Sequence, residues 1–154
     1  MLVPALLHKE ELERKFAEVM YSDEYFYYLG YAHGHELPRI EQRDNQYQWA
    51  IVNKDGNLIG YLAYTIIQDT DTVTYFGMFG FDGNPVLGYD IVKHLEELIA
   101  SHRRIEWRCI GGNPVLKHYK KFCREHNGDY VILHDVVKDN IGNYWDEYIF
   151  EIVN

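Results

Sequence analysis

Tyr119 carries a titratable phenol in a segment predicted to be helical after the break at residues 111–114. A phenol has a pKa of about 10, so a tyrosine keeps its proton at neutral pH and could donate it to a reacting group. Tyr119 also falls on the apolar side of its helix, with Val115 and Phe122. A proton donor and an ordinary core tyrosine are both consistent with this position.

The loop at residues 83–88, Gly-Asn-Pro-Val-Leu-Gly, is a second candidate, because it joins a predicted strand to a predicted helix. Free N–H groups and the helix dipole make the start of a helix a site for phosphate groups. The alternative is a turn with no ligand. Gly83 and Gly88 have the glycine spacing of a P-loop, but Tyr89 stands where the lysine must be, so nucleoside triphosphates are not expected to bind.

Metal ligands are not evident, although the chain has eight histidines. There is no HExxH pattern, and neither Cys109 nor Cys123 belongs to a CxxC pair. His33 and His35 alone make a weak pair. We predict no metal site, and two separated thiols are typical of a reduced compartment.

The elements that must hold these residues follow from hydrophobic periodicity. The predicted order is β-α-α-β-β-β-α-β-α-β-β, an α/β arrangement with one mixed sheet flanked by helices, and residues 1–154 form one domain. The unit from residue 72 to 110 predicts two parallel strands joined by a right-handed helical crossover. Strands are expected at residues 2–7, 47–53, 58–67, 72–81, 105–109, 131–137 and 144–153, and helices at 8–20, 23–32, from 85 to about 101 and from 114 to about 127.

Composition narrows the classes of function. The 154 residues are 47% apolar and 25% charged, as in ordinary globular domains. The formal net charge is −9, so the protein lacks the basic surface typical of nucleic-acid-binding proteins. Anionic membranes should repel a protein of this charge. The longest apolar stretch spans ten residues, 58–67, whereas a membrane helix needs about 20. We expect a soluble cytoplasmic protein that binds neither nucleic acid nor membrane.

The order of elements and three segments resemble the GNAT superfamily of acyl-CoA N-acyltransferases. Residues 49–61 look like its paired strands with a hydrophobic-Gly-hydrophobic pattern, and residues 113–122 are similar to its Asn-x-x-small-x-x-x-Tyr segment, although Tyr119 comes one residue early. Residues 78–88 correspond to the family's pyrophosphate loop, Gln/Arg-x-x-Gly-x-Gly/Ala. Only Gly88 matches that loop, because Gly83 and Val86 replace its first two marked residues.

The resemblance implies acetyl-CoA as the acyl donor and a primary amine of a small molecule or peptide as the acceptor, which attacks directly in a ternary complex. It assigns Tyr119 as the general acid and a backbone N–H near Met78 and Phe79 as the oxyanion donor. The residues it implies for acetyl-CoA binding are Met78, Phe79, Gly80, Gly83, Asn84, Val86, Gly88, Tyr89 and Asn113.

Alternatives to this assignment stay open. One is a GNAT-shaped CoA-binding or interaction module without catalysis, suggested by the altered loop and the shifted tyrosine. Another is a toxin-like or ribosome-linked acetyltransferase, although the net negative charge argues against direct binding to RNA. Whether the chain forms a homodimer is also open.

The acceptor side and the general base are less defined. Six aromatic residues crowd into a short segment where the resemblance implies a wall of the acceptor site: Tyr21, Tyr25, Phe26, Tyr27, Tyr28 and Tyr31. A water chain or one of several side chains could take the amine proton: His35, Glu36, Asp69, Asp71 or Glu106.

A basic helix face is predicted after residue 113 and is either solvated or directed at the 3′-phosphate of CoA. It comprises Lys117, His118, Lys120, Lys121 and Arg124.

Overall fold

The computed structural model describes residues 1–20, 38–83, 89–139 and 141–154. Its strands are β1 (Leu2–Pro4), β2 (Gln46–Val52), β3 (Leu58–Ile67), β4 (Thr72–Gly80), β5 (Arg104–Ile110), β6 (Asp129–Lys138) and β7 (Tyr144–Val153). Its helices are α1 (Lys9–Met20), α2 (Tyr89–Ser101) and α3 (Leu116–Glu125), with short 3-10 helices η1 (Ala5–His8) and η3 (Gln68–Thr70).

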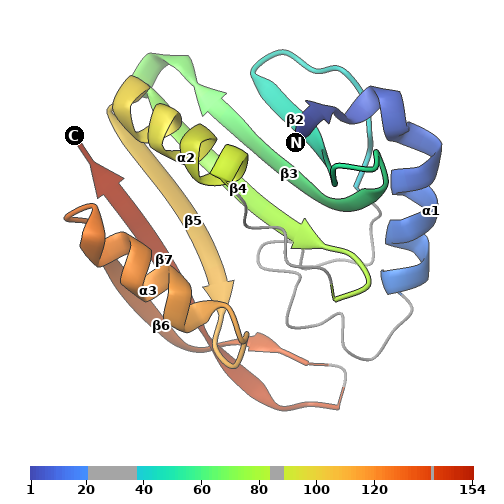
Figure 1. Ribbon diagram of the computed structural model, residues 1–154. Helices are drawn as coiled ribbons and strands as arrows, with labels where there is room; N and C mark the ends of the chain where they lie inside the picture. Colours follow the sequence, from blue (N-terminus) through green and yellow to red (C-terminus); the bar gives the residue numbers. More distant parts are fainter. Residues whose placement is uncertain (21–37, 84–88, 140) are drawn as a thin grey trace.

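The seven strands of the described residues belong to one sheet, in the order β1-β2-β3-β4-β5-β7-β6. Neighbours are antiparallel except β4 and β5, which run parallel. A parallel pair needs a long crossover connection, and α2 lies in that connection (Figure 1). This confirms the predicted parallel unit between residues 72 and 110.

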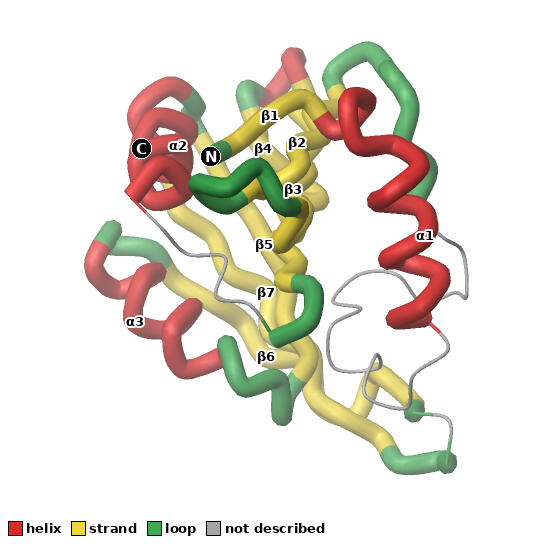
Figure 2. Tube along the Cα trace, turned by 45° about the vertical axis from the view of Figure 1, so that its right-hand side comes forward, coloured by secondary structure: helices red, strands yellow, loops and turns green. Residues whose placement is uncertain are grey.

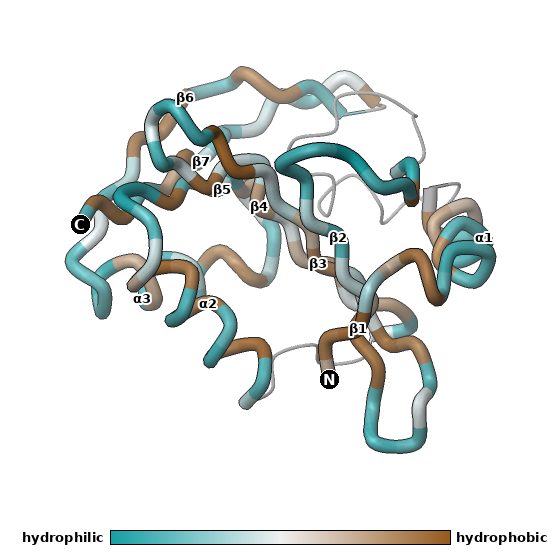
Figure 3. The backbone as a smooth tube through the Cα atoms, turned by 90° about the horizontal axis from the view of Figure 1, so that it is seen from above, coloured by the Kyte–Doolittle hydropathy of each residue, from teal (hydrophilic) through white to brown (hydrophobic). Residues whose placement is uncertain are grey.

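Helices cover both faces of the sheet: α1 lies on one side, and α2 and α3 lie on the other (Figure 2). Under α1, Phe16 packs against three rings of the sheet, Tyr61, Phe79 and Phe81. The larger cluster lies under α2 and α3 and includes Trp107 and Phe150, whose rings stack at 5.1 Å. Figure 3 shows brown and teal alternating along α2, as expected for a helix with one apolar side.

Among the described elements, the first strand alone differs clearly from its prediction. β1 ends at Pro4, and η1 follows instead of a strand to residue 7. Proline has no N–H for the strand ladder, and the turn buries Ala5 in the cluster under α1. The predicted helix at residues 23–32 lies outside the described residues. Within the described part of the chain, no helix has the length and apolarity needed to cross a membrane.

Candidate active site

β4 and β5 separate halfway along their length. Their last paired residues are Phe76 and Trp107, although β4 continues to Gly80 and β5 to Ile110. The cause is a bulge: β4 has one residue more than either neighbour between residues 73 and 77, and Tyr75 there has a φ of 51°. A bulge bends its strand and ends pairing. The C-terminal halves of the two strands therefore diverge (Figure 1).

Two backbone amides of β4 face the gap that this separation leaves. The N–H of Phe81 donates to the carbonyl of Ile59 at 2.9 Å, on the β3 side. Backbone groups alternate in direction along a strand, so Phe79 also turns its N–H toward β3. The N–H groups of Met78 and Gly80 then point the other way, toward β5. Such donors, held by a sheet, suit an oxygen that gains negative charge.

An apolar cavity of about 80 Å³ adjoins this gap on the side of α2 and α3. Its floor is formed by β4 and β5, and its walls by the two helices; the lining residues are Phe76, Met78, Leu95, Leu98, Ile99, Ile105, Trp107, Val115, His118, Tyr119 and Phe122. The volume is well below the roughly 300–1,000 Å³ of typical ligand sites, so it would hold part of a ligand only.

Tyr119 is partly buried on the wall of this cavity. Its ring packs edge-on against Trp107 at 6.2 Å and Phe150 at 6.1 Å. Burial, and to a lesser degree the nearby thiol of Cys109, raises the pKa of Tyr119 above its usual range. The phenol therefore keeps its proton at neutral pH and can act as an acid but not as a base. The position is compatible with both interpretations of Tyr119, proton donor and core residue.

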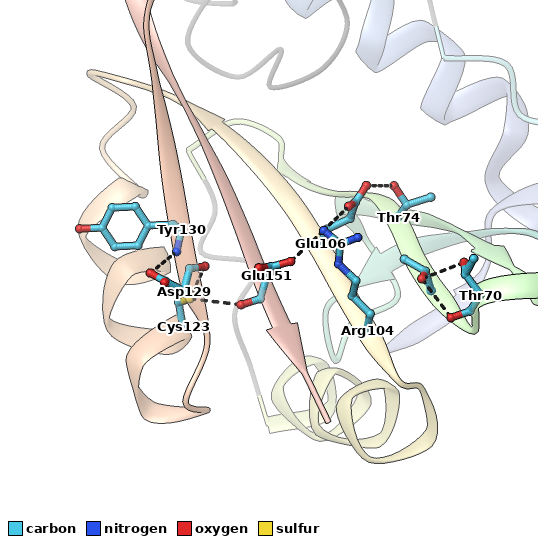
Figure 4. A network of polar contacts seen from close by, with 9 residues as sticks. Thr70, Thr74, Arg104, Glu106, Cys123, Asp129, Tyr130 and Glu151 are labelled. Atoms are coloured by element: carbon cyan, nitrogen blue, oxygen red, sulfur yellow. Dashed lines mark hydrogen bonds and ion pairs between the residues drawn. The ribbon is translucent and has the colours of Figure 1, made fainter.

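The opposite face of the sheet carries charged side chains beside the same gap. Glu106 accepts a hydrogen bond from the hydroxyl of Thr74 at 2.5 Å. Its other oxygen lies 3.2 Å from Arg104, which also contacts Glu151 at 2.8 Å (Figure 4). Glu106 is thus held at the base of the gap, one residue before the last pair Phe76–Trp107.

An ion pair with one buried partner, Glu147, lies next along this face. Arg108 Nη1 is 3.2 Å from Oε2 of Glu147, whose side chain is only 4% exposed. The second oxygen of Glu147 is buried without a hydrogen-bond partner within the described residues. The sequence alone did not single out either residue. Strand alternation would place Arg108 beside Glu106, but locating Glu147 requires the register of β5 with β7.

Comparisons with solved structures find proteins of the same fold, whereas neither protein-family models nor curated protein sequences give a match. An N-acetyltransferase from Staphylococcus aureus Mu50 is 13% identical, with a TM-score of 0.71 over 99% of this chain and 97% of its own. Spermidine/spermine N-acetyltransferase SpeG from Vibrio cholerae is 17% identical, with a TM-score of 0.56 over 73% of this chain and 67% of its own.

A third similar structure is an acetyltransferase from Salmonella typhimurium that modifies the N-terminal serine of a 50S ribosomal subunit protein. It is 16% identical, with a TM-score of 0.54 over 73% of this chain and 66% of its own. The chain has the GNAT fold. The fold class predicted from the order of elements is thereby confirmed, while at these identities the activity has to be argued from the site.

The pyrophosphate loop that the GNAT resemblance implies is described only at its two ends. Asn84, Val86 and Gly88 lie outside the described residues. Gly83 follows β4 with a φ of 67°, a conformation that favours glycine. Asp82, whose charge would oppose a phosphate, forms an ion pair with Lys15 of α1. Tyr89 is the first residue of α2 and is largely exposed.

Asn113 shapes the start of α3, the other helix beside the cavity. Its side-chain oxygen accepts from the N–H of Val115 at 3.0 Å, and its carbonyl accepts from Leu116 at 3.0 Å. Of the basic residues on α3, Lys120 lies 4.4 Å from the ring centre of Tyr148, and Lys121 is 3.6 Å from Glu125. These two cations have partners within the GNAT fold itself.

The candidate general bases lie at different positions in the fold. Asp71 lies at the start of β4, at the end of the strand away from the gap. It contacts His102 at 2.7 Å and accepts the N–H of Arg103, and these bonds lower its pKa. Asp69 is in η3, at the same end. Glu106 alone of the predicted bases in the described residues lies beside the gap.

Neither His35 nor Glu36 is among the described residues, and the same is true of the aromatic cluster between residues 21 and 31. Among the residues that are described, no three His, Cys, Asp or Glu side chains come together as a metal site would require. Burial raises the pKa of the Cys109 thiol to about 12, so this cysteine is a core residue.

Proposed function

We propose that the protein is an N-acyltransferase that moves an acyl group from an acyl-CoA thioester, acetyl-CoA being the simplest donor, to a primary amine. The observation that carries the proposal is the pair of amides, Met78 and Gly80, that face a gap between strands beside an apolar cavity. Proteins of similar fold act on spermidine and spermine and on an N-terminal serine, which supports an amine acceptor.

The two faces of the sheet suggest how the substrates divide. The side of α2 and α3 offers an apolar cavity, which suits an apolar part of the donor. The side of α1 presents Glu106 beside the gap, whose carboxylate can accept a proton. Donor and acceptor would then approach the gap from opposite faces, as a ternary complex requires.

The proposed roles account for every bond and proton. The acyl carbon forms a bond with the amine nitrogen and loses its bond with sulfur. The amide of Met78 donates to the thioester oxygen while that oxygen carries negative charge. The amine loses a proton toward Glu106 or a water beside it, and Tyr119 donates its proton to the leaving sulfur.

Thermal unfolding with and without donor is the experiment that tests this proposal. Acetyl-CoA or CoA at about 100 times its Kd should stabilise the protein by about 2.7 kcal/mol. For a chain of this length the melting temperature should rise by about 5–10 °C. ATP at the same concentration serves as a control anion. No shift at millimolar acetyl-CoA would overturn the proposal.

Turnover is tested by thiol release from acetyl-CoA in the presence of spermidine, free amino acids and a peptide with an N-terminal serine. Spermidine and the serine peptide represent the acceptor types of the similar structures, and free amino acids add a small amine of another kind. Release that depends on one of them identifies the acceptor class. Donor binding without release for any amine would favour the alternative, a CoA-binding module without catalysis.

Replacing Tyr119 by phenylalanine tests the general acid. If the phenol protonates the thiolate, we expect kcat to fall about 100-fold or more, while the Kd for CoA and the melting temperature change little. The measurement is thiol release with the acceptor found above, alongside calorimetric binding of CoA. An unchanged rate would make Tyr119 a core residue only.

A further inference from the structure

We propose that the cavity between α2 and α3 binds the acyl chain of the donor, and that the preferred donor carries a chain about two or three carbons longer than acetyl. Butyryl-CoA and isovaleryl-CoA represent this class. The inference rests on the proposed function, because it concerns the same donor. It adds a specificity that an acetyltransferase would not need.

The position of the cavity relative to the gap is the first argument. Met78 belongs to both: its N–H faces the gap, and its side chain lines the cavity. From there the lining passes Phe76 and Trp107, where the two strands close. The cavity therefore begins where the thioester oxygen would be held and continues past the closed end of the gap.

The far end of the cavity lies deeper in the core. It is lined by Ile105, which precedes the closing pair on β5, and by Leu98 and Ile99 from the last two turns of α2. Leu98 and Ile105 are both buried, each 6% exposed. A chain that entered at Met78 would lie there against hydrocarbon side chains.

The chemistry of the lining is the second argument. Apart from His118 and the phenol of Tyr119, every lining side chain is aliphatic, aromatic or a thioether, with one indole. Such walls offer few hydrogen-bond partners to phosphates or to the amides of CoA, and they disfavour a cationic acceptor. An alkyl chain is the part of an acyl donor that matches them.

The volume sets the length of the chain. A cavity of about 80 Å³ exceeds the single methyl group of an acetyl donor. At roughly 30 Å³ for a group the size of a water molecule, it accepts about two or three carbon atoms. It is too small for the long chains of fatty acids.

Calorimetric titration with CoA, acetyl-CoA, butyryl-CoA and isovaleryl-CoA tests the inference without knowledge of the acceptor. Each buried methylene should tighten binding about fourfold, the equivalent of 0.8 kcal/mol, so butyryl-CoA should bind about 15-fold more tightly than acetyl-CoA. The Kd of CoA itself, which has no acyl chain, measures how tightly the protein binds the rest of the donor.

The variant Ile99→Phe fills the far end of the cavity, and Ile99→Leu is its control of equal volume. We expect butyryl-CoA to bind Ile99→Phe no more tightly than acetyl-CoA does, while the Kd of CoA stays within about twofold of the native value. Ile99→Leu should retain the tighter binding of butyryl-CoA. If Ile99→Phe does not fold, Val115→Ile narrows the cavity from α3 by one methylene and should reduce the gain.

The outcomes separate this inference from the proposed function. Equal Kd values for acetyl-CoA and butyryl-CoA in the native protein would overturn the inference and leave an acetyltransferase. If butyryl-CoA still binds more tightly than acetyl-CoA in both Ile99→Phe and Val115→Ile, the acyl chain lies elsewhere, and this result would also overturn the inference. Absence of binding by every one of the four ligands would overturn the proposed function and the inference together.

Discussion

Replacing Met78 by proline is expected to lower kcat about 100- to 1,000-fold, the loss typical of removing one donor to an oxyanion. The backbone N–H that proline removes faces the gap, where β4 is not paired with β5. A strand edge tolerates proline when the lost N–H was unpaired with a neighbouring strand. The ladder with β3, which uses Phe79 and Phe81, should survive. The measurement is thiol release at saturating donor and acceptor.

Met78→Ala is the matched control, because it shortens the same side chain and keeps the amide. We expect its kcat to stay within about tenfold of the native value. Circular dichroism and the melting temperature of Met78→Pro establish that the variant is folded. A folded Met78→Pro variant with the kcat of Met78→Ala would show that this amide does not stabilise the reaction.

Replacing Arg108 by leucine is expected to cost about 3–5 kcal/mol of folding free energy, which is the usual effect of leaving a buried charge without its partner. Glu147 is buried, and the ion pair with Arg108 supplies its hydrogen bond. The other carboxylate oxygen already lacks a partner in the described chain, so nothing else there would compensate. Thermal unfolding should show a melting temperature lower by about 6–20 °C.

The double variant Arg108→Leu with Glu147→Leu distinguishes the pair from other effects of the substitution. Removing both charges should recover most of the lost stability, because well-packed apolar residues often replace a buried pair at little cost. If the double variant is as unstable as Arg108→Leu, then the loss comes from contacts of Arg108 other than Glu147. An unchanged melting temperature in the single variant would contradict the expectation outright.

Periodicity along the chain was sufficient for most of the fold. The apolar stretch from Leu58 to Ile67 predicted a strand with the bounds of β3, and the spacing of Leu12, Phe16 and Val19 predicted α1. Turn residues such as Gly56 separated the strands correctly. These features depend on residues within a few positions of one another, which is why a single sequence reveals them. The failure at Pro4 is of the same local kind, since a proline can end a strand as well as begin a turn.

For the candidate site, the sequence predicted individual residues but not their positions relative to one another. Tyr119, Met78 and Glu106 could be named from the sequence because each lies in a segment with a recognisable pattern. Their relation could not, because it depends on the bulge at Tyr75, a non-glycine residue with positive φ that no local pattern indicates. Without that extra residue β4 and β5 could pair to their ends, and the amide of Met78 would then join the ladder.

By itself the sequence determined most of the described elements, their order and the parallel pair of strands joined through a helix, since local periodicity and turn residues encode these directly. Tertiary structure alone decided that Glu147 meets Arg108 from 39 positions away, and that α2 and α3 leave an apolar cavity beside the gap. Both depend on strand register and on how side chains from four elements fill space. Those are properties of packing between distant segments, and no short stretch of residues carries them.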